Sequence, residues 1–222
     1  MGTVTGWWFA AADDDGVVRL PRGDGRIVRV GETLGVDGPI VPCESGLHAS
    51  RRVIDALRYA PGPWLARVEL SGTVVEEEDK LVASARTTLW LADVSRILHT
   101  FACDVAERAL IYDRRAKGAE LDSRPWKTIA VKRRWIDGEA TDVELVVAME
   151  TVRGDTWGVA EAAAIADARD AAKKAARAAL GPRQAYNREA AMDLAVWEER
   201  EWQDKHLLDL LREAGAPVEE EA

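Results

Sequence analysis

The 222-residue sequence has few of the side chains on which metal centres and disulfide frameworks depend, with only two cysteines and three histidines. Cys43 and Cys103 lie far apart in the chain. No two of His48, His99 and His206 have the close spacing of a zinc-binding motif. Such low cysteine usage is typical of a reducing compartment. We therefore expect no metal site, no structural disulfide and a cytoplasmic location.

Long apolar runs are also absent from the sequence. No stretch approaches the roughly 18 uncharged residues that a membrane-spanning helix needs. The first residues, MGTVTGWWFAAADDDG, lack the basic start and the long apolar core of a secretory signal. Gly6 stands where the N-myristoylation pattern requires Ser or Thr. We therefore expect a soluble protein that does not associate with membranes.

The sequence has fewer positively charged than negatively charged residues. Lys and Arg number 30 against 39 Asp and Glu, which gives a formal net charge of -9. This balance repels a phosphate backbone, and no basic stretch is strong enough to offset it, so we do not expect nucleic-acid binding. The hydrophobic content of 47% is ordinary for a globular protein, and the chain is long enough to bury a core.

The chain up to about residue 92 has the pattern of a small β-sheet with one helix. The bulky apolar run GWWFAA ends at the turn signal DDDG. Two short strands, Val17–Leu20 and Arg26–Val30, are expected around the turn PRGDG. WLARVELSG alternates polar and apolar residues, which is typical of a half-buried strand. Apolar residues at helical spacing in 53–60, followed by Pro61, predict one short helix.

After about residue 93 the periodicity becomes helical. An apolar stripe in 94–112 follows Asp93, a plausible cap. The next helix has Pro125 in its first turn and ends at Gly138. Thr141 and Glu144 then have the spacing of a capping box. A long Ala-rich segment and a final amphipathic segment complete a bundle of about five helices, in 159–182 and 187–215.

These patterns together predict an α+β protein in two parts. Residues 1–92 form a small mixed or antiparallel sheet with one short helix. Residues 93–215 form an all-α, Ala-rich helical bundle, and residues 216–222 form an acidic tail.

The densest group of reactive side chains lies in PCESGLHASRRVIDALRYAPG, where a strand passes into the short helix. A turn at Gly46 would bring the thiol of Cys43 near the imidazole of His48. Catalytic Cys and His residues are usually distant in sequence, so we assign no catalytic residue here. We expect instead that the segment PCESGLHAS, residues 42–50, forms a structural turn with a small pocket, and we call this segment the elbow. The candidate pocket residues are Cys43, Glu44, His48, Arg51, Asp55 and Tyr59.

Two further segments are candidates for contact with a partner. Trp7 and Trp8 are adjacent on a predicted strand and so point to opposite faces. One of them then faces the helical part or a partner surface, and we favour packing within the protein. The acidic run of Glu76, Glu77 and Glu78 is a candidate surface for a basic partner, although such runs are usually only solvated.

Four segments between residues 5 and 92 resemble a widespread, uncharacterised family of phage, prophage and bacterial proteins. They are CESGLHAS, DALRYAPG, LARVELSG and DKLVASARTTL. The family shares a Cys-Glu-x-Gly-(Leu or Phe)-His-Ala signature, a short helix ending near Tyr, a Val-Glu-x-x-Gly strand and a Lys-Val-Ala-Ser segment. The resemblance implies a phage or prophage origin and no particular activity.

The second part is similar to a helical domain of predicted immunity proteins. In that family an Asp-x-Arg-Pro helix precedes Trp-(Leu or Ile)-x-Gly and Ala-rich helices, and its members are predicted to neutralise toxins. The segments that carry the similarity are FACDVAERALIYDRR, DSRPWKTIAVKRRWIDGEA, the Ala-rich segment and WQDKHLLDLL. The resemblance implies a protein partner.

The layout GLHAS, ALRYAPG, LARVELSG also resembles the middle of ADP-ribosyltransferases of the poly-ADP-ribose polymerase type. This resemblance implies that His48 stands where those enzymes have a nicotinamide-stacking Tyr, and that VVEEED supplies an acidic residue. The strand GWWFAA departs from the family, because it lacks the His-Gly or Arg that holds the dinucleotide.

We therefore favour a non-enzymatic function, that of a phage-associated or immunity-like binding protein. It would act without a cofactor through contacts with a host or toxin protein, in the host cytoplasm if it is phage-encoded. A nucleotide-binding or ADP-ribosyltransferase-like enzyme that uses the elbow pocket is the alternative, and a minor virion component is a third. The enzyme requires an open cleft where His48 and a carboxylate converge, whereas the binding protein tolerates a filled one. The sequence leaves the oligomeric state open.

Overall fold

The computed structural model describes residues 2–20, 25–117, 123–151 and 188–218. These residues form a mixed α+β fold, which confirms the predicted class at that level. The chain divides into two compact units. The first comprises Met1–Ser95 and Leu208–Ala222, and the second comprises Arg96–Leu207. The predicted Ala-rich helix, 159–182, and the last residues of the predicted tail lie outside the described residues.

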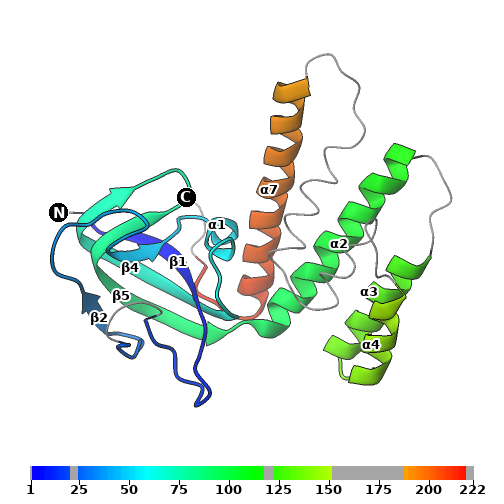
Figure 1. Cartoon of the computed structure of the whole chain (residues 1–222), viewed down its shortest axis with the longest axis horizontal. Helices are drawn as coiled ribbons and strands as arrows, with labels where there is room; N and C mark the ends of the chain where they lie inside the picture. The colour runs from blue at the N-terminus through cyan, green and yellow to red at the C-terminus, as the bar shows by residue number, and fades with distance from the viewer. Residues whose placement is uncertain (1, 21–24, 118–122, 152–187, 219–222) are drawn as a thin grey trace. The chain divides into compact units, whose positions relative to one another are not determined.

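The first unit is built around a five-stranded antiparallel sheet (Figure 1). Its strand order is β1-β4-β5-β2, and β3 also pairs with β5. β4 and β5 are the longest strands and form a hairpin. The strands are β1 Val4–Ala10, β2 Thr33–Gly35, β3 Leu47–Ala49, β4 Trp64–Glu76 and β5 Leu81–Asp93.

The alternating sequence of β4 decides which of its residues face the core. Ala66, Val68 and Leu70 are fully buried, whereas the residues between them are partly exposed. Trp8 of β1 lies opposite Ala66, and the core cluster continues across β5 and β2 to Leu34. Period-two patterning therefore predicted the buried face of this strand correctly.

The sheet closes on itself where Trp7 meets Ser50. The Trp7 amide donates to the Ser50 carbonyl at 2.7 Å, and the Ser50 amide donates back at 2.9 Å. Ser50 directly follows β3, which pairs with β5 on its other side, so β1 and β3 complete a ring of paired strands. The close approach favours glycine at position 6, because a Cβ there would lie 3.0 Å from the Ser50 carbonyl oxygen. A closed sheet has fewer unpaired edges and encloses a core.

The helix predicted in 53–60 is α1, Val53–Leu57, and it packs against β1. The strands predicted at Val17–Leu20 and Arg26–Val30 are not formed as strands. These segments meet only through isolated bridges, with hydrogen bonds between Leu20 and Arg26 and between Val28 and Val18. The two segments pair over too few residues to form a regular ladder. The prediction of two strands here was therefore wrong.

The elements described in the second unit are helical. They are α2 Ser95–Lys117, α3 Arg124–Ile136, α4 Asp142–Glu150 and α7 Arg188–Glu213 up to Leu207. The predicted capping box of α4 is confirmed, because Thr141 and Glu144 bond each other's backbone amides. Asp93 accepts from the Ser95 amide at 2.8 Å at the start of α2, as predicted. Among the helices that the structure describes, none has both the length and the apolar composition to cross a membrane.

Candidate functional site

A cavity of about 950 Å³ lies in the first unit, and the predicted elbow forms part of its wall. Small-molecule sites in proteins typically have volumes of about 300–1,000 Å³, so this cavity is at the large end of that range. Its wall combines aromatic side chains with polar and charged ones. Trp7, Trp8 and Phe9 come from β1, Tyr59 follows α1, and residues of the 43–50 segment and of β5 complete the wall. We call it the elbow cavity.

The elbow has its shape because of two residues with left-handed backbone. Gly46 has φ +123°, and a Cβ at this position would lie 2.4 Å from Cγ1 of Val82. Only glycine therefore fits the turn, in agreement with the role predicted for it. Cys43 has φ +67°, a conformation that is uncommon for residues other than glycine. Together these residues turn the chain so that it enters β3 beside β5.

Four of the six predicted pocket residues line the elbow cavity, and these are Cys43, Glu44, His48 and Tyr59. Arg51 does not line it, because its guanidinium pairs with Glu76, with Nη2 2.8 Å from Oε2. Asp55 lies in α1 and is only 6% exposed, and it is not part of the wall either. The sequence thus located the elbow but not every residue that faces the cavity.

The Cys43 thiol is hydrogen-bonded to Lys80 in the cavity wall. Lys80 Nζ donates to Cys43 Sγ at 2.9 Å and also lies 2.9 Å from a carboxylate oxygen of Glu77. The hydrogen bond to Cys43 and the contact with Glu77 together raise the pKa of Lys80. The thiol therefore lies beside a cation.

Arg86 of β5 is the wall residue that the sequence did not reveal. It is 2% exposed, and its guanidinium carbon lies 3.8 Å from the ring centre of Trp8. Its Nη1 donates to the backbone carbonyl of His48 at 2.7 Å, whereas Nε and Nη2 have no hydrogen-bond partner among the described residues. Burial lowers the pKa of Arg86 to about 9, because desolvation penalises the charged form. The guanidinium is therefore still a cation at neutral pH.

The strand register explains why Arg86 is buried. Arg86 lies opposite Leu70 of β4 on one side and opposite Leu34 of β2 on the other, and both leucines belong to the core. It thus occupies a core-facing position in the middle of the sheet. An irregularity in the β4–β5 pairing between Arg67 and Val68 changes the alternation nearby. A single strand sequence does not reveal this register, so Arg86 could have been found only by pairing β4 with β5.

The candidate partner-surface tryptophans lie inside the first unit. Trp7 is 4% exposed and Trp8 is 9% exposed, and both line the elbow cavity. Each is stacked by an arginine, because the Arg67 guanidinium carbon lies 4.8 Å from the Trp7 ring centre and Arg86 covers Trp8. The structure therefore gives the pair a role in the core and in the cavity wall.

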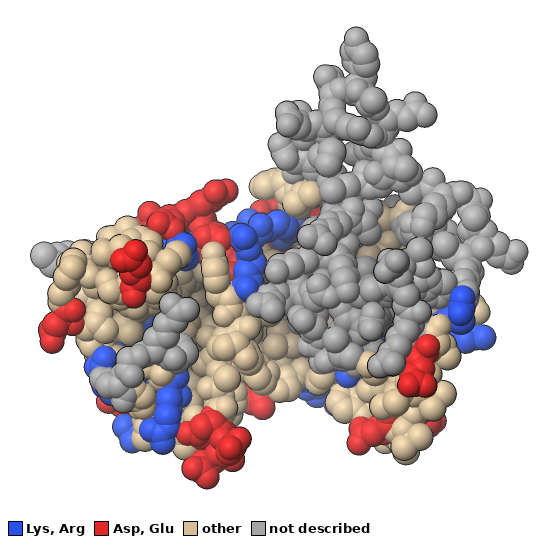
Figure 2. All heavy atoms as spheres, viewed as in Figure 1, with Lys and Arg blue, Asp and Glu red and all other residues tan. Residues whose placement is uncertain are grey.

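The candidate acidic patch is exposed, but two of its carboxylates are already paired. Glu76 pairs with Arg51, and Glu77 pairs with Lys80. Glu78 is exposed. On the face that Figure 2 shows, acidic and basic side chains are interspersed over the described surface.

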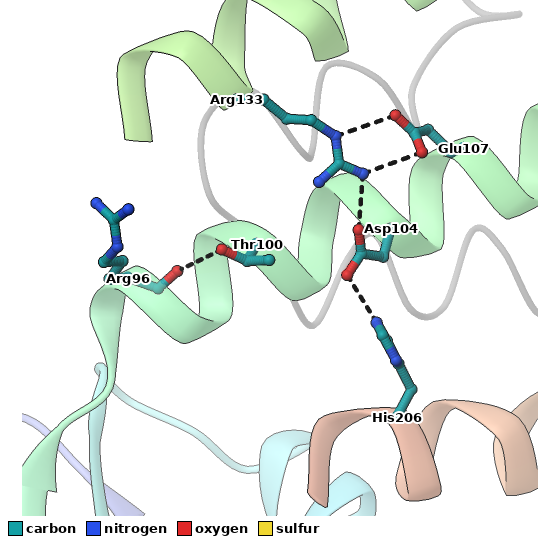
Figure 3. A network of polar contacts seen from close by, with 6 residues as sticks. All are labelled: Arg96, Thr100, Asp104, Glu107, Arg133 and His206. Carbon is teal, nitrogen blue, oxygen red and sulfur yellow. Dashed lines mark hydrogen bonds and ion pairs between the residues drawn. The ribbon is translucent and has the colours of Figure 1, made fainter. Parts of the chain in front are cut away.

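A second group of charged residues joins the helices within the second unit (Figure 3). Arg133 Nη2 of α3 lies 2.7 Å from Asp104 and 3.0 Å from Glu107, both on α2. His206 of α7 bonds the other oxygen of Asp104 at 2.6 Å, and Trp202 stacks on its ring. Burial raises the pKa of Asp104, but the bonds from His206 and Arg133 outweigh it and lower the pKa. The charges compensate one another, which is typical of a structural network.

Within the ranges that the structure describes, no group of three or more His, Cys, Asp or Glu side chains is arranged to hold a metal ion. Comparison of the chain with protein-family models, curated proteins and solved structures gives no significant match. The function is therefore inferred from the elbow cavity itself.

Proposed function

We propose that the first unit binds a small organic ligand in the elbow cavity. The observation that carries the proposal is the cavity of about 950 Å³, whose wall joins Trp8, His48 and Arg86. Aromatic walls with a few convergent polar groups are the usual composition of sites that bind and orient small molecules. Glu44 and Lys80 add one charge of each sign to the same wall.

Nucleotides are the first ligand class to test. The resemblance to ADP-ribosyltransferases places His48 at the nicotinamide position, and His48 lines the cavity. Glu76, from the acidic segment of that resemblance, pairs with Arg51 and is not part of the wall. Glu44 is the carboxylate that lines the cavity together with His48. These positions support ligand binding, and we assign no catalytic role to any of them.

The test is a thermal-unfolding panel with NAD, ADP-ribose, AMP and adenosine on the full chain. Val36 lines the cavity, so Val36→Trp fills part of it, whereas Val30 is 58% exposed and outside the wall. We expect a panel ligand to raise the unfolding midpoint of the wild type and of Val30→Trp but not of Val36→Trp. Equal shifts in all three proteins would place binding elsewhere and refute the proposal.

A second candidate function, contact with a host or toxin protein, rests on exposed apolar residues in the second unit. Val143, Val146 and Val147 of α4 are 72%, 54% and 59% exposed, and Trp197 of α7 is 58% exposed. The three valines lie within about one turn of α4, and clustered apolar exposure of this kind is typical of interaction surfaces. We propose that the second unit is the all-α, Ala-rich bundle of a phage-associated or immunity-like cytoplasmic protein.

This second candidate predicts that substitution of the α4 valines removes a partner. Host proteins captured by the wild type are compared with those captured by Val143→Asp/Val147→Asp and by the control Val30→Asp. We expect one protein to be lost with the α4 variant alone. Identical capture by all three proteins would contradict an α4 interface.

A further inference from the structure

Arg86 is more deeply buried than the paired arginines of the second unit, and no described residue supplies it with a counter-charge. Burying a charge is costly unless an opposite charge or several hydrogen bonds compensate it. Arg108 pairs with Glu199 at 2.6 Å, and Arg133 pairs with two carboxylates. Among the described residues, no carboxylate contacts the Arg86 guanidinium, and burial alone shifts its pKa. The fold therefore holds a nearly unexposed cation whose charge nothing described neutralises.

The unused part of the guanidinium is the edge that binds oxyanions best. Nη1 is occupied by the His48 carbonyl, and the ring of Trp8 fixes the guanidinium plane. Nε and Nη2 share the opposite edge and donate in parallel, which matches the two oxygens of a carboxylate or phosphate. Both supporting contacts fix Arg86 in place. Nε and Nη2 each have less than 1 Å² of accessible surface, so an oxyanion reaches them when a neighbouring side chain of the wall moves aside.

We propose that Arg86 binds the oxyanion of the cavity ligand, a carboxylate or a phosphate, through Nε and Nη2. The inference rests on the proposed function and specifies the chemistry of its ligand: an acid with an apolar or aromatic body. The other charges of the wall do not provide a counter-charge for Arg86, because Lys80 is paired with Glu77 and no described carboxylate contacts the Arg86 guanidinium. A buried cation of this kind favours an anionic ligand over a cationic one.

The test compares anionic probes with neutral analogues of the same body by titration calorimetry on the full chain. AMP is compared with adenosine, and phenylacetate with phenylacetamide, so the two pairs separate a phosphate from a carboxylate. Arg86→Met removes the charge at similar length, and Arg86→Lys keeps the charge without the fork. Arg67→Lys is the matched control, because Arg67 also stacks on a tryptophan but does not line the cavity.

We expect the wild type and Arg67→Lys to bind one anionic probe roughly 10- to 100-fold more tightly than its neutral analogue. This preference should vanish in Arg86→Met and shrink in Arg86→Lys. An anion preference that persists in Arg86→Met would overturn the inference, and so would a wild type that prefers neither anion. If neutral analogues still bind the wild type but not Val36→Trp, the cavity function stands while the Arg86 assignment fails.

Discussion

Arg86 and Trp8 form a stacked pair inside the first unit, with the guanidinium carbon 3.8 Å from the ring centre. The pair joins β5 to β1 across the face of the sheet that carries the core, and both residues line the elbow cavity. Stacking on an aromatic ring compensates part of the cost of burying the charge. No described carboxylate compensates the remainder, and we propose that a ligand does so.

Removing this charge should not destabilise the protein in the absence of ligand. We expect Arg86→Met to unfold at a midpoint equal to or above that of the wild type, because the substitution removes the cost of burying a charge without a counter-charge. Thermal unfolding of both proteins in a buffer without oxyanions measures this. A midpoint far below that of the wild type would identify Arg86 as a structural residue.

The two cysteines should differ sharply in reactivity. Cys43 is exposed at the cavity wall, whereas Cys103 is buried in α2, where burial raises its pKa to about 11. We expect a disulfide reagent at pH 7.5 to modify one thiol quickly in the native protein and the second only after unfolding. Cys43→Ser should abolish the fast phase, and a cavity ligand should slow it. Two fast thiols in the native protein would contradict the burial of Cys103.

Replacement of Gly46 should destabilise the protein more than replacement of a glycine that has open space around it. Alanine at position 46 combines left-handed backbone strain with a contact of 2.4 Å to Val82, and we expect a loss of roughly 2–4 kcal/mol. Gly38 is the matched control, because it also has positive φ but has open space around its position. Gly38→Ala should cost only about 1 kcal/mol. Urea unfolding measures both values, and equal losses would show that the contact with Val82 does not matter.

The Asp104 network should contribute to stability only above the acid range. The folded pKa of Asp104 lies below the unfolded value of 3.8, so the folded state holds fewer protons near that pH. Its contribution is therefore complete above the unfolded pKa and is lost as the pH falls through the folded pKa. We expect Asp104→Asn to cost roughly 1–3 kcal/mol at pH 6, because Arg133 and His206 lose a charged partner.

The pH dependence separates this charge effect from a loss of packing. Urea unfolding from pH 6 to pH 2 should show the wild-type advantage over Asp104→Asn shrinking toward the acid end. Glu107→Gln is the control, because Glu107 is more exposed than Asp104 and should cost at most about 1 kcal/mol. A difference between the wild type and Asp104→Asn that does not change with pH would contradict the account.

Local chemistry made several elements predictable from the sequence. The Thr141–Glu144 capping box, the alternation of β4 and the turn at Gly46 each depend on neighbouring residues alone. The segment 17–30 was misassigned, because its turn signals do not say how many residues pair across it. Local sequence patterns thus predicted whether a segment is a helix, strand or turn better than they predicted where each element begins and ends.

Arg86 was not identified from the sequence as a residue of the cavity wall, and the reason is a different one. Whether Arg86 faces solvent or core depends on its register with Leu70 and Leu34, which belong to two other strands. The same is true of Trp8, which lies opposite Ala66 of β4 in the core cluster. The sequence indicated the elbow through Gly46 but not which residues of other strands face it, because sheet pairing is long-range.

The most direct test is the unfolding midpoint of the wild type, Val36→Trp and Arg86→Met, measured without ligand and with either ADP-ribose or phenylacetate. The account predicts a rise in midpoint for the wild type and little or none for the two variants, because one fills the cavity and the other removes the oxyanion site. A wild type that does not respond, or a rise of equal size in all three proteins, would contradict it.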